Sequence, residues 1–109
     1  MDVRTGARQQ RLRLVTAPEM SRSVERHLNS EKPVALSKAA LEALAVVAYR
    51  QPIARSGIEL IRGSASDSAI ATLLERRLIE YNPHHLFVTT RSFLDFAGLR
   101  DVSDLPPLT

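Results

Sequence analysis

The sequence has 109 residues and a formal net charge of +3, and its 44% of hydrophobic and 25% of charged residues fit one ordinary globular domain. The absence of cysteine excludes disulfides and thiolate chemistry. No apolar run approaches the roughly 20 residues that span a bilayer, and the first residues lack the apolar core of a signal peptide, so we expect a cytoplasmic protein without a membrane segment.

The basic charge is concentrated at the N-terminus. Residues 1–10 are polar and have no hydrophobic period, so we expect a basic tail without regular structure. Residues 14–109 carry 11 basic and 11 acidic side chains and are therefore close to neutral. This distribution predicts only weak, non-specific contacts with DNA phosphates, made by four arginines: Arg4, Arg8, Arg11 and Arg13.

A strand and a helix are expected to link this tail to the rest of the chain, over residues 11–33. Leucine and arginine alternate over residues 11–16, which predicts a short extended segment. Pro18 suits the first turn of a helix that continues to about Asn29.

A strongly apolar helix is predicted next, at the start of a domain expected over residues 34–100. Ser37 is a suitable N-cap for a helix from Lys38 to about Arg50, and Pro52 prevents that helix from continuing. Residues 53–54 then form a short extended segment.

Two further helices follow the extended segment. The first is predicted from Arg55 to Arg62, with Gly63 as its C-terminal cap. The second begins at a cap provided by Ser66 or Asp67 and runs to about Arg77.

Beyond these helices the hydrophobic period changes from helical to extended. Residues 78–81 and 86–90 predict two strands, joined by a tight turn at residues 82–85. A short helix over residues 92–97 closes the domain. Residues 101–109 contain two prolines and are expected to lack regular structure.

The order of these elements is that of a winged helix, in which a two-stranded hairpin follows a helix-turn-helix. We therefore predict an α+β fold that is mostly α, consisting of a winged helix and a preceding N-terminal helix. Because one fold supports many functions, the fold class by itself does not define what the chain does.

Several segments resemble the segregation and condensation protein B family. LSKAALEALAVVAYRQPIARSGIELIRG at residues 36–63, LLERRLIE at residues 73–80 and TTRSFLDFAGLRDVSDLPPL at residues 89–108 resemble its second winged-helix domain and closing segment. RLRLVTAPEMSRSVERHL at residues 11–28 is similar to the link between its two domains. The resemblance covers about residues 11–108, and AYRQPI and DLPPL are its most distinctive strings.

The resemblance implies a protein that is not an enzyme and has no cofactor. It implies a subunit of a bacterial chromosome segregation and condensation complex at the nucleoid, which binds a kleisin, segregation and condensation protein A. Through the kleisin it would reach the structural-maintenance-of-chromosomes ATPase, and family members typically do so as homodimers. Two departures stand out: a polar tail replaces the family's first winged helix, and NPHH at residues 82–85 replaces a longer wing turn.

The helix from Lys38 to Arg50 is apolar nearly all round, so it must be covered on more than one side. Either the helix that begins near Pro18 or a partner helix covers the second face, and the sequence leaves both alternatives open. The phenylalanines of the last helix likewise pack in the core or against a partner. The candidate partner-binding residues are Ala40, Ala43, Val46, Val47, Phe93 and Phe96.

The alternative function is that of a winged-helix transcription regulator, which would read DNA with the helix that follows Ser66. Asp67 at the start of this helix would repel phosphates. Its expected outer face lacks the Asn, Gln and Lys that commonly pair with bases, and contains Ser68, Thr72, Glu75 and Arg76. The sequence therefore favours an interaction subunit over a DNA reader.

Catalytic and metal sites are not indicated. His84 and His85 are adjacent in the predicted turn, but the chain lacks the further ligands typical of structural zinc. Its four glycines form no phosphate-binding loop. The carboxylates of Glu42, Glu59, Glu75 and Glu80 are spread over different elements and are expected on solvated faces.

Overall fold

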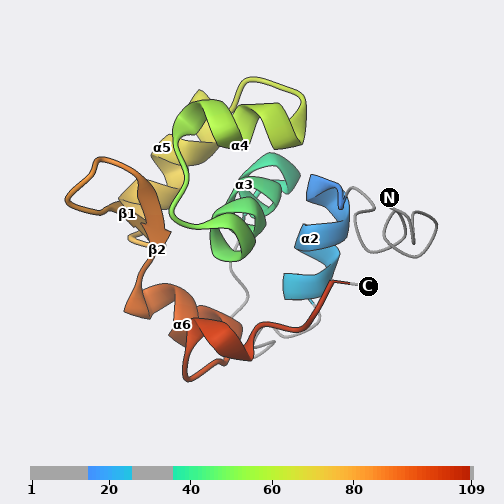
Figure 1. Ribbon diagram of the computed structural model, residues 1–109, viewed down its shortest axis with the longest axis vertical. Helices are drawn as coiled ribbons and strands as arrows, with labels where there is room; N and C mark the ends of the chain where they lie inside the picture. Colours follow the sequence, from blue (N-terminus) through green and yellow to red (C-terminus); the bar gives the residue numbers. More distant parts are fainter. Residues whose placement is uncertain (1–14, 26–35, 109) are drawn as a thin grey trace, which may run out of the picture.

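Helix α3 (Lys38–Arg50) occupies the middle of the fold (Figure 1). The computed structural model describes residues 15–25 and 36–108. Helix α3 lies between α2 (Ala17–Glu25) on one side and the helix-turn-helix and wing on the other. Nearly its whole circumference is enclosed, as the apolar pattern predicts, and its buried aliphatic side chains are Ala40, Ala43, Leu44, Ala45, Val46, Val47 and Ala48.

Side-chain caps close the N-termini of α2 and α3. Ser37 Oγ accepts a hydrogen bond from Ala40 N at 3.0 Å, which confirms the predicted cap of α3. At the start of α2, Glu19 Oε1 accepts from Thr16 N at 3.1 Å and Thr16 Oγ1 accepts from Glu19 N at 3.3 Å. This reciprocal pair is a capping box, and it places Pro18 in the first helical turn, as predicted.

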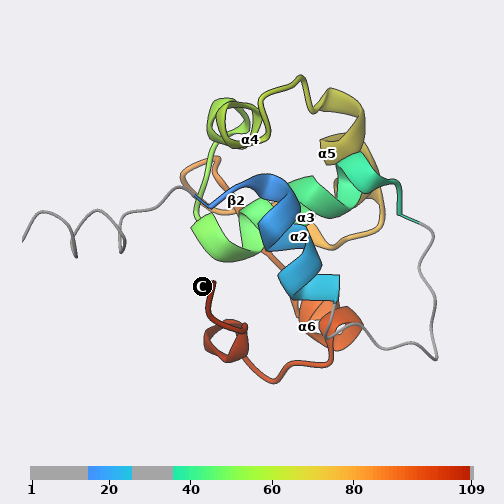
Figure 2. The same cartoon turned by 90° about the vertical axis from the view of Figure 1, so that its right-hand side faces the viewer.

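Helix α2 covers one face of α3. Ala17, Met20 and Val24 are at most 1% exposed, and they belong to the same buried cluster as the side chains of α3. Figure 2, turned so that this side faces the viewer, shows α2 crossing in front of α3. The sequence left open whether the chain's own helix or a partner helix packs on the second face of α3. In the structure the chain's own helix, α2, packs there.

The segment before α2 differs from its prediction. The prediction for residues 11–16 is a short strand or extended segment, and residues 15–16 form no strand. The side chain and backbone of Thr16 bond to Glu19 and start the helix at this point. Residues 11–14, and the predicted continuation of the helix to Asn29, lie outside the described residues.

Helix α4 (Arg55–Arg62) has the predicted bounds. Gly63 follows it with φ of 75°, in the left-handed region that glycine adopts without a steric penalty. Within the helix, a Cβ at Gly57 would come within 2.7 Å of Ile53 Cγ1. Glycine there allows α4 to pack directly against the extended segment that precedes it.

Helix α5 (Asp67–Glu75) ends two residues earlier than predicted. Arg77 has φ of 61°, which a helix cannot accommodate, and Leu78 N donates to Leu73 O at 3.0 Å across the resulting turn. This turn directs the chain out of the helix and into the wing.

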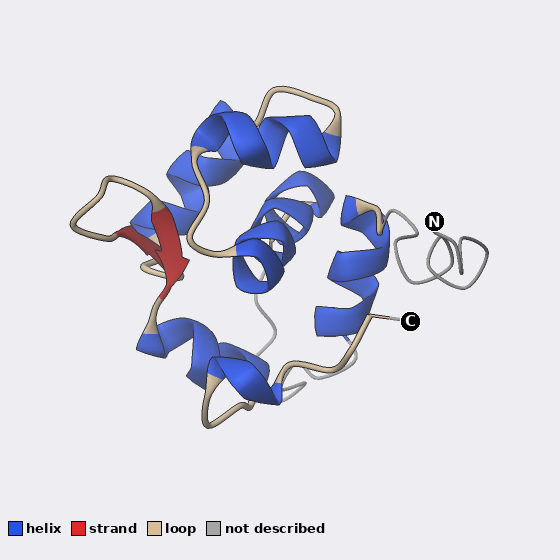
Figure 3. Ribbon diagram, viewed as in Figure 1, coloured by secondary structure: helices blue, strands red, loops and turns tan. Residues whose placement is uncertain are grey.

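The wing is an antiparallel pair of β1 (Ile79–Tyr81) and β2 (Phe87–Thr89), both of which lie within the predicted strands (Figure 3). The extended segment before α4 joins it through an isolated bridge between Ile53 and Phe87. Two backbone hydrogen bonds form this bridge, with N···O distances of 3.1 and 2.7 Å. The bridge holds the start of α4 against the wing.

A side chain organises the wing turn, which occurs where it was predicted. Asn82 Oδ1 accepts hydrogen bonds from His84 N at 2.9 Å and from Leu86 N at 3.0 Å. An Asn side chain that bonds backbone groups further along the chain is typical of tight turns. The turn fixes the strand register, in which Glu80 lies opposite Val88.

Helix α6 (Arg91–Ala97) starts one residue earlier than predicted. Thr90 Oγ1 accepts the capping hydrogen bond from Phe93 N at 3.2 Å, so the N-cap is Thr90. The helix ends at Gly98, which has φ of 72° as expected for a C-terminal cap.

The prediction that residues 101–109 lack regular structure is wrong for a short 3₁₀ helix, η1 (Val102–Asp104). Asp101 Oδ2 accepts from Ser103 N at 2.8 Å, and Asp104 Oδ2 accepts from Asp101 N at 3.1 Å. These bonds form a capping box that organises the turn locally. Hydrogen bonds from the side chain and backbone of Ser103 also hold the pKa of Asp101 below its usual value.

Candidate interaction surface

The predicted partner-binding residues lie in the core or at its edge. The structure encloses five of them, Ala40, Ala43, Val46, Val47 and Phe93. The sixth, Phe96, is half-buried and packs against the same cluster. Because α2, α4, α5 and β2 all pack against α3 in this structure, a partner would reach these buried residues of α3 only if one of those elements moved away.

The outer face of α5 offers few groups that read bases. Asp67 carries an ion pair with Arg55, at 3.1 Å between carboxylate oxygen and guanidinium nitrogen. The other outward residues of this region are Ser68, Thr72, Glu75 and Arg76, of which Thr72 is half-buried. The arginines predicted to contact phosphates lie outside the described residues: Arg4, Arg8, Arg11 and Arg13.

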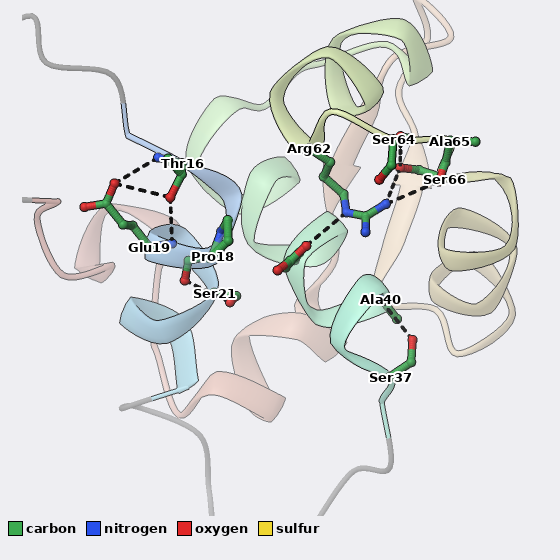
Figure 4. Close-up of polar contacts among 11 residues, drawn as sticks. Thr16, Pro18, Glu19, Ser21, Ser37, Ala40, Arg62, Ser64, Ala65 and Ser66 are labelled. Atoms are coloured by element: carbon green, nitrogen blue, oxygen red, sulfur yellow. Dashed lines mark hydrogen bonds and ion pairs between the residues drawn. The ribbon is translucent and has the colours of Figure 1, made fainter.

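A buried ion pair joins α3 to α4 (Figure 4). Arg62 Nε donates to Glu42 Oε1 at 3.3 Å, and the two side chains are only 9% and 10% exposed. The prediction that Glu42 lies on a solvated face is therefore wrong. The guanidinium also donates through Nη1 to Ser66 Oγ at 2.7 Å, so one side chain connects α3, α4 and the turn before α5.

Ser66 has a different role from the predicted one. It occupies the N-cap position of α5, but its side chain makes no capping bond. Its hydroxyl accepts from Arg62 and donates to Ser64 O at 3.2 Å, while its backbone N–H donates to Glu59 Oε2 at 2.9 Å. A network of polar side chains thus holds the turn between α4 and α5, and it fixes the orientation of α5 relative to α4.

Gln51 connects the end of α3 to the wing. Its Oε1 accepts from Thr89 N at 2.9 Å, and its Nε2 donates to Ala48 O and to Thr89 Oγ1, both at 3.1 Å. The side chain thus gives the backbone N–H of Thr89 in β2 a hydrogen-bond partner.

Tyr49 connects three parts of the chain that are distant in sequence. Its hydroxyl lies 2.9 Å from Ser23 Oγ in α2 and 2.7 Å from Pro106 O in the terminal segment. A phenol has one hydrogen to donate, and the carbonyl of Pro106 can only accept. The Tyr49 hydroxyl therefore donates to Pro106 O and accepts from Ser23.

The described residues contain no group of three or more side chains that could hold a metal ion. His84 and His85 are exposed in the wing turn. Over the same part of the chain, no helix is long and apolar enough to cross a membrane.

Comparison with known proteins identifies the family. A family model described as segregation and condensation complex subunit ScpB matches residues 5–108. The segregation and condensation protein B of Desulforamulus reducens is 50% identical over 102 residues, which cover 87% of this chain and 56% of that protein. The protein of the same name from Syntrophotalea carbinolica is 44% identical, with 87% of this chain and 51% of that protein covered. The chain belongs to the ScpB family.

A solved structure agrees with this assignment. The crystal structure of ScpB from Mycobacterium tuberculosis is similar with a TM-score of 0.52 and 42% sequence identity, over 58% of this chain and 43% of that one. The mostly helical fold with a two-stranded wing is the predicted α+β winged helix. The chain spans about half the length of the curated ScpB relatives that it matches.

The two strings that most distinguish the ScpB resemblance meet in space. Tyr49 belongs to AYRQPI and Pro106 belongs to DLPPL, and the hydrogen bond between them spans 57 positions. Sequence reasoning found both strings but assigned no contact to either. The available signal was a tyrosine in the last turn of an otherwise apolar helix, since a buried tyrosine hydroxyl usually has a partner.

Replacing Tyr49 with phenylalanine is expected to lower the free energy of unfolding by about 1–2 kcal/mol, because Pro106 O and the buried Ser23 hydroxyl both lose their partner. Urea unfolding followed by circular dichroism measures the change. The matched control is Tyr81→Phe on the wing, where the side chain is 52% exposed and a change within about 0.5 kcal/mol is expected. Equal stability of the wild type and the Tyr49 variant would contradict the role of this hydroxyl.

Proposed function

We propose that this chain is a non-catalytic subunit of a segregation and condensation complex, and that its winged helix binds a kleisin, segregation and condensation protein A. The match of residues 5–108 to the ScpB family carries the proposal. Through the kleisin the chain would act on the structural-maintenance-of-chromosomes ATPase, in the cytoplasm at the nucleoid.

The exposed surface supports binding to protein rather than to bases. Leu60 on α4 is 82% exposed, and Tyr81 on β1 stacks on Phe87 with ring centroids 4.6 Å apart while remaining half open to solvent. Apolar and aromatic side chains of this kind commonly anchor protein interfaces. By contrast, the outer face of α5 combines acidic and basic groups, which weakens the case for a transcription regulator.

Co-expression with the kleisin tests the proposal directly. The tagged chain is expected to retain the kleisin through affinity and size-exclusion chromatography, and light scattering on the complex then gives the number of copies and hence any homodimer. Leu60→Asp should reduce retention while leaving the melting temperature unchanged, because this side chain makes few contacts within the chain. Failure of the wild-type chain to retain the kleisin would contradict the proposal.

DNA binding is expected to be weak, independent of sequence and carried by the first 13 residues. Each phosphate contact adds about −0.9 to the slope of log affinity against log salt, so four arginines limit the slope to roughly −3.6. Fluorescence anisotropy on short duplexes over a range of salt concentrations measures this slope. Deleting residues 1–13 should remove most of the affinity.

Selecting the duplexes that the chain binds from a pool of random sequences distinguishes an interaction subunit from a transcription regulator. The subunit proposal predicts that no motif is enriched. If one motif were enriched, and if Thr72→Ala with Arg76→Ala abolished the enrichment, the chain would be a DNA reader that uses α5.

A further inference from the structure

We draw no further inference here: the strongest candidate, the surface patch of the wing that contains the exposed side chains of Tyr81, His84 and His85, carries nothing because it also exposes Glu80 and nothing in the part of the chain that the structure describes shows what covers it.

Discussion

Replacing Val47 with aspartate is expected to lower the free energy of unfolding by on the order of 4 kcal/mol, a large part of the stability of a small domain. Val47 is completely buried in α3, within the apolar cluster that α2 and the helix-turn-helix enclose. An aspartate there would have to bury a charge without a partner or take up a proton, and the surrounding packing would be lost in either case. Thermal and urea unfolding by circular dichroism measure the change.

The same substitution distinguishes between the two alternatives for what packs on the second face of α3, namely α2 or a partner helix. If α2 covers Val47 in solution, the variant has a lower free energy of unfolding. It then also fails to bind the kleisin, because the domain is no longer folded. A variant with wild-type stability that fails only to retain the kleisin would mean that a partner provides the cover. Leu60→Asp is the matched control, since Leu60 is 82% exposed and the same change in chemistry should alter stability by no more than about 0.5 kcal/mol.

Elements bounded by local signals could be predicted from the sequence. Helix α3 begins at a serine cap and ends before a proline, and α4 ends at a glycine, so both have the predicted bounds. The wing turn was found for the same reason, because the Asn82 side chain bonds the backbone two and four residues later. These signals act within a few residues, and they do not depend on the rest of the fold.

Features that depend on distant contacts could not be predicted. Residues 105–108 lack regular structure, as the two prolines predict, but the hydrogen bond that Pro106 O accepts from Tyr49, 57 positions away, has no local signal in the sequence. The sequence did not determine which helix packs on the second face of α3, for a similar reason. An apolar face shows that a helix is covered, and it contains no information on which helix covers it.

The candidate interaction surface was the least predictable part. The predicted residues were chosen because they are apolar, and this property also places residues in the core, where five of the six lie. Leu60 is apolar too, but only the packing of α4 shows that it points to solvent. Glu42 is the reverse case, a charged residue that is buried. Because it lies in the middle of a helix that is apolar nearly all round, its carboxylate is expected to have a buried partner.

Removing that partner is the second change with a large expected effect. Arg62→Met should lower the free energy of unfolding by about 3–5 kcal/mol, because it leaves the buried Glu42 carboxylate without its counter-charge. The hydroxyl of Ser66 would lose its guanidinium donor as well. Because this network holds the turn before α5, amide hydrogen exchange should increase in that turn more than in the wing.

Adding Glu42→Leu to Arg62→Met should recover most of the lost stability. Two buried charges are expensive to desolvate, and replacing both with apolar side chains of similar volume is often neutral or even stabilising. A double-mutant cycle from urea unfolding of the wild type, both single variants and the double variant gives the coupling energy between the two positions. If Arg62→Met alone cost less than about 1 kcal/mol, the pair would be open to water in solution, as exposed ion pairs are. If the double variant were as unstable as Arg62→Met, the loss would instead arise from the contacts of Arg62 with the α4–α5 turn, namely Ser66 Oγ at 2.7 Å and Ala65 O at 3.4 Å.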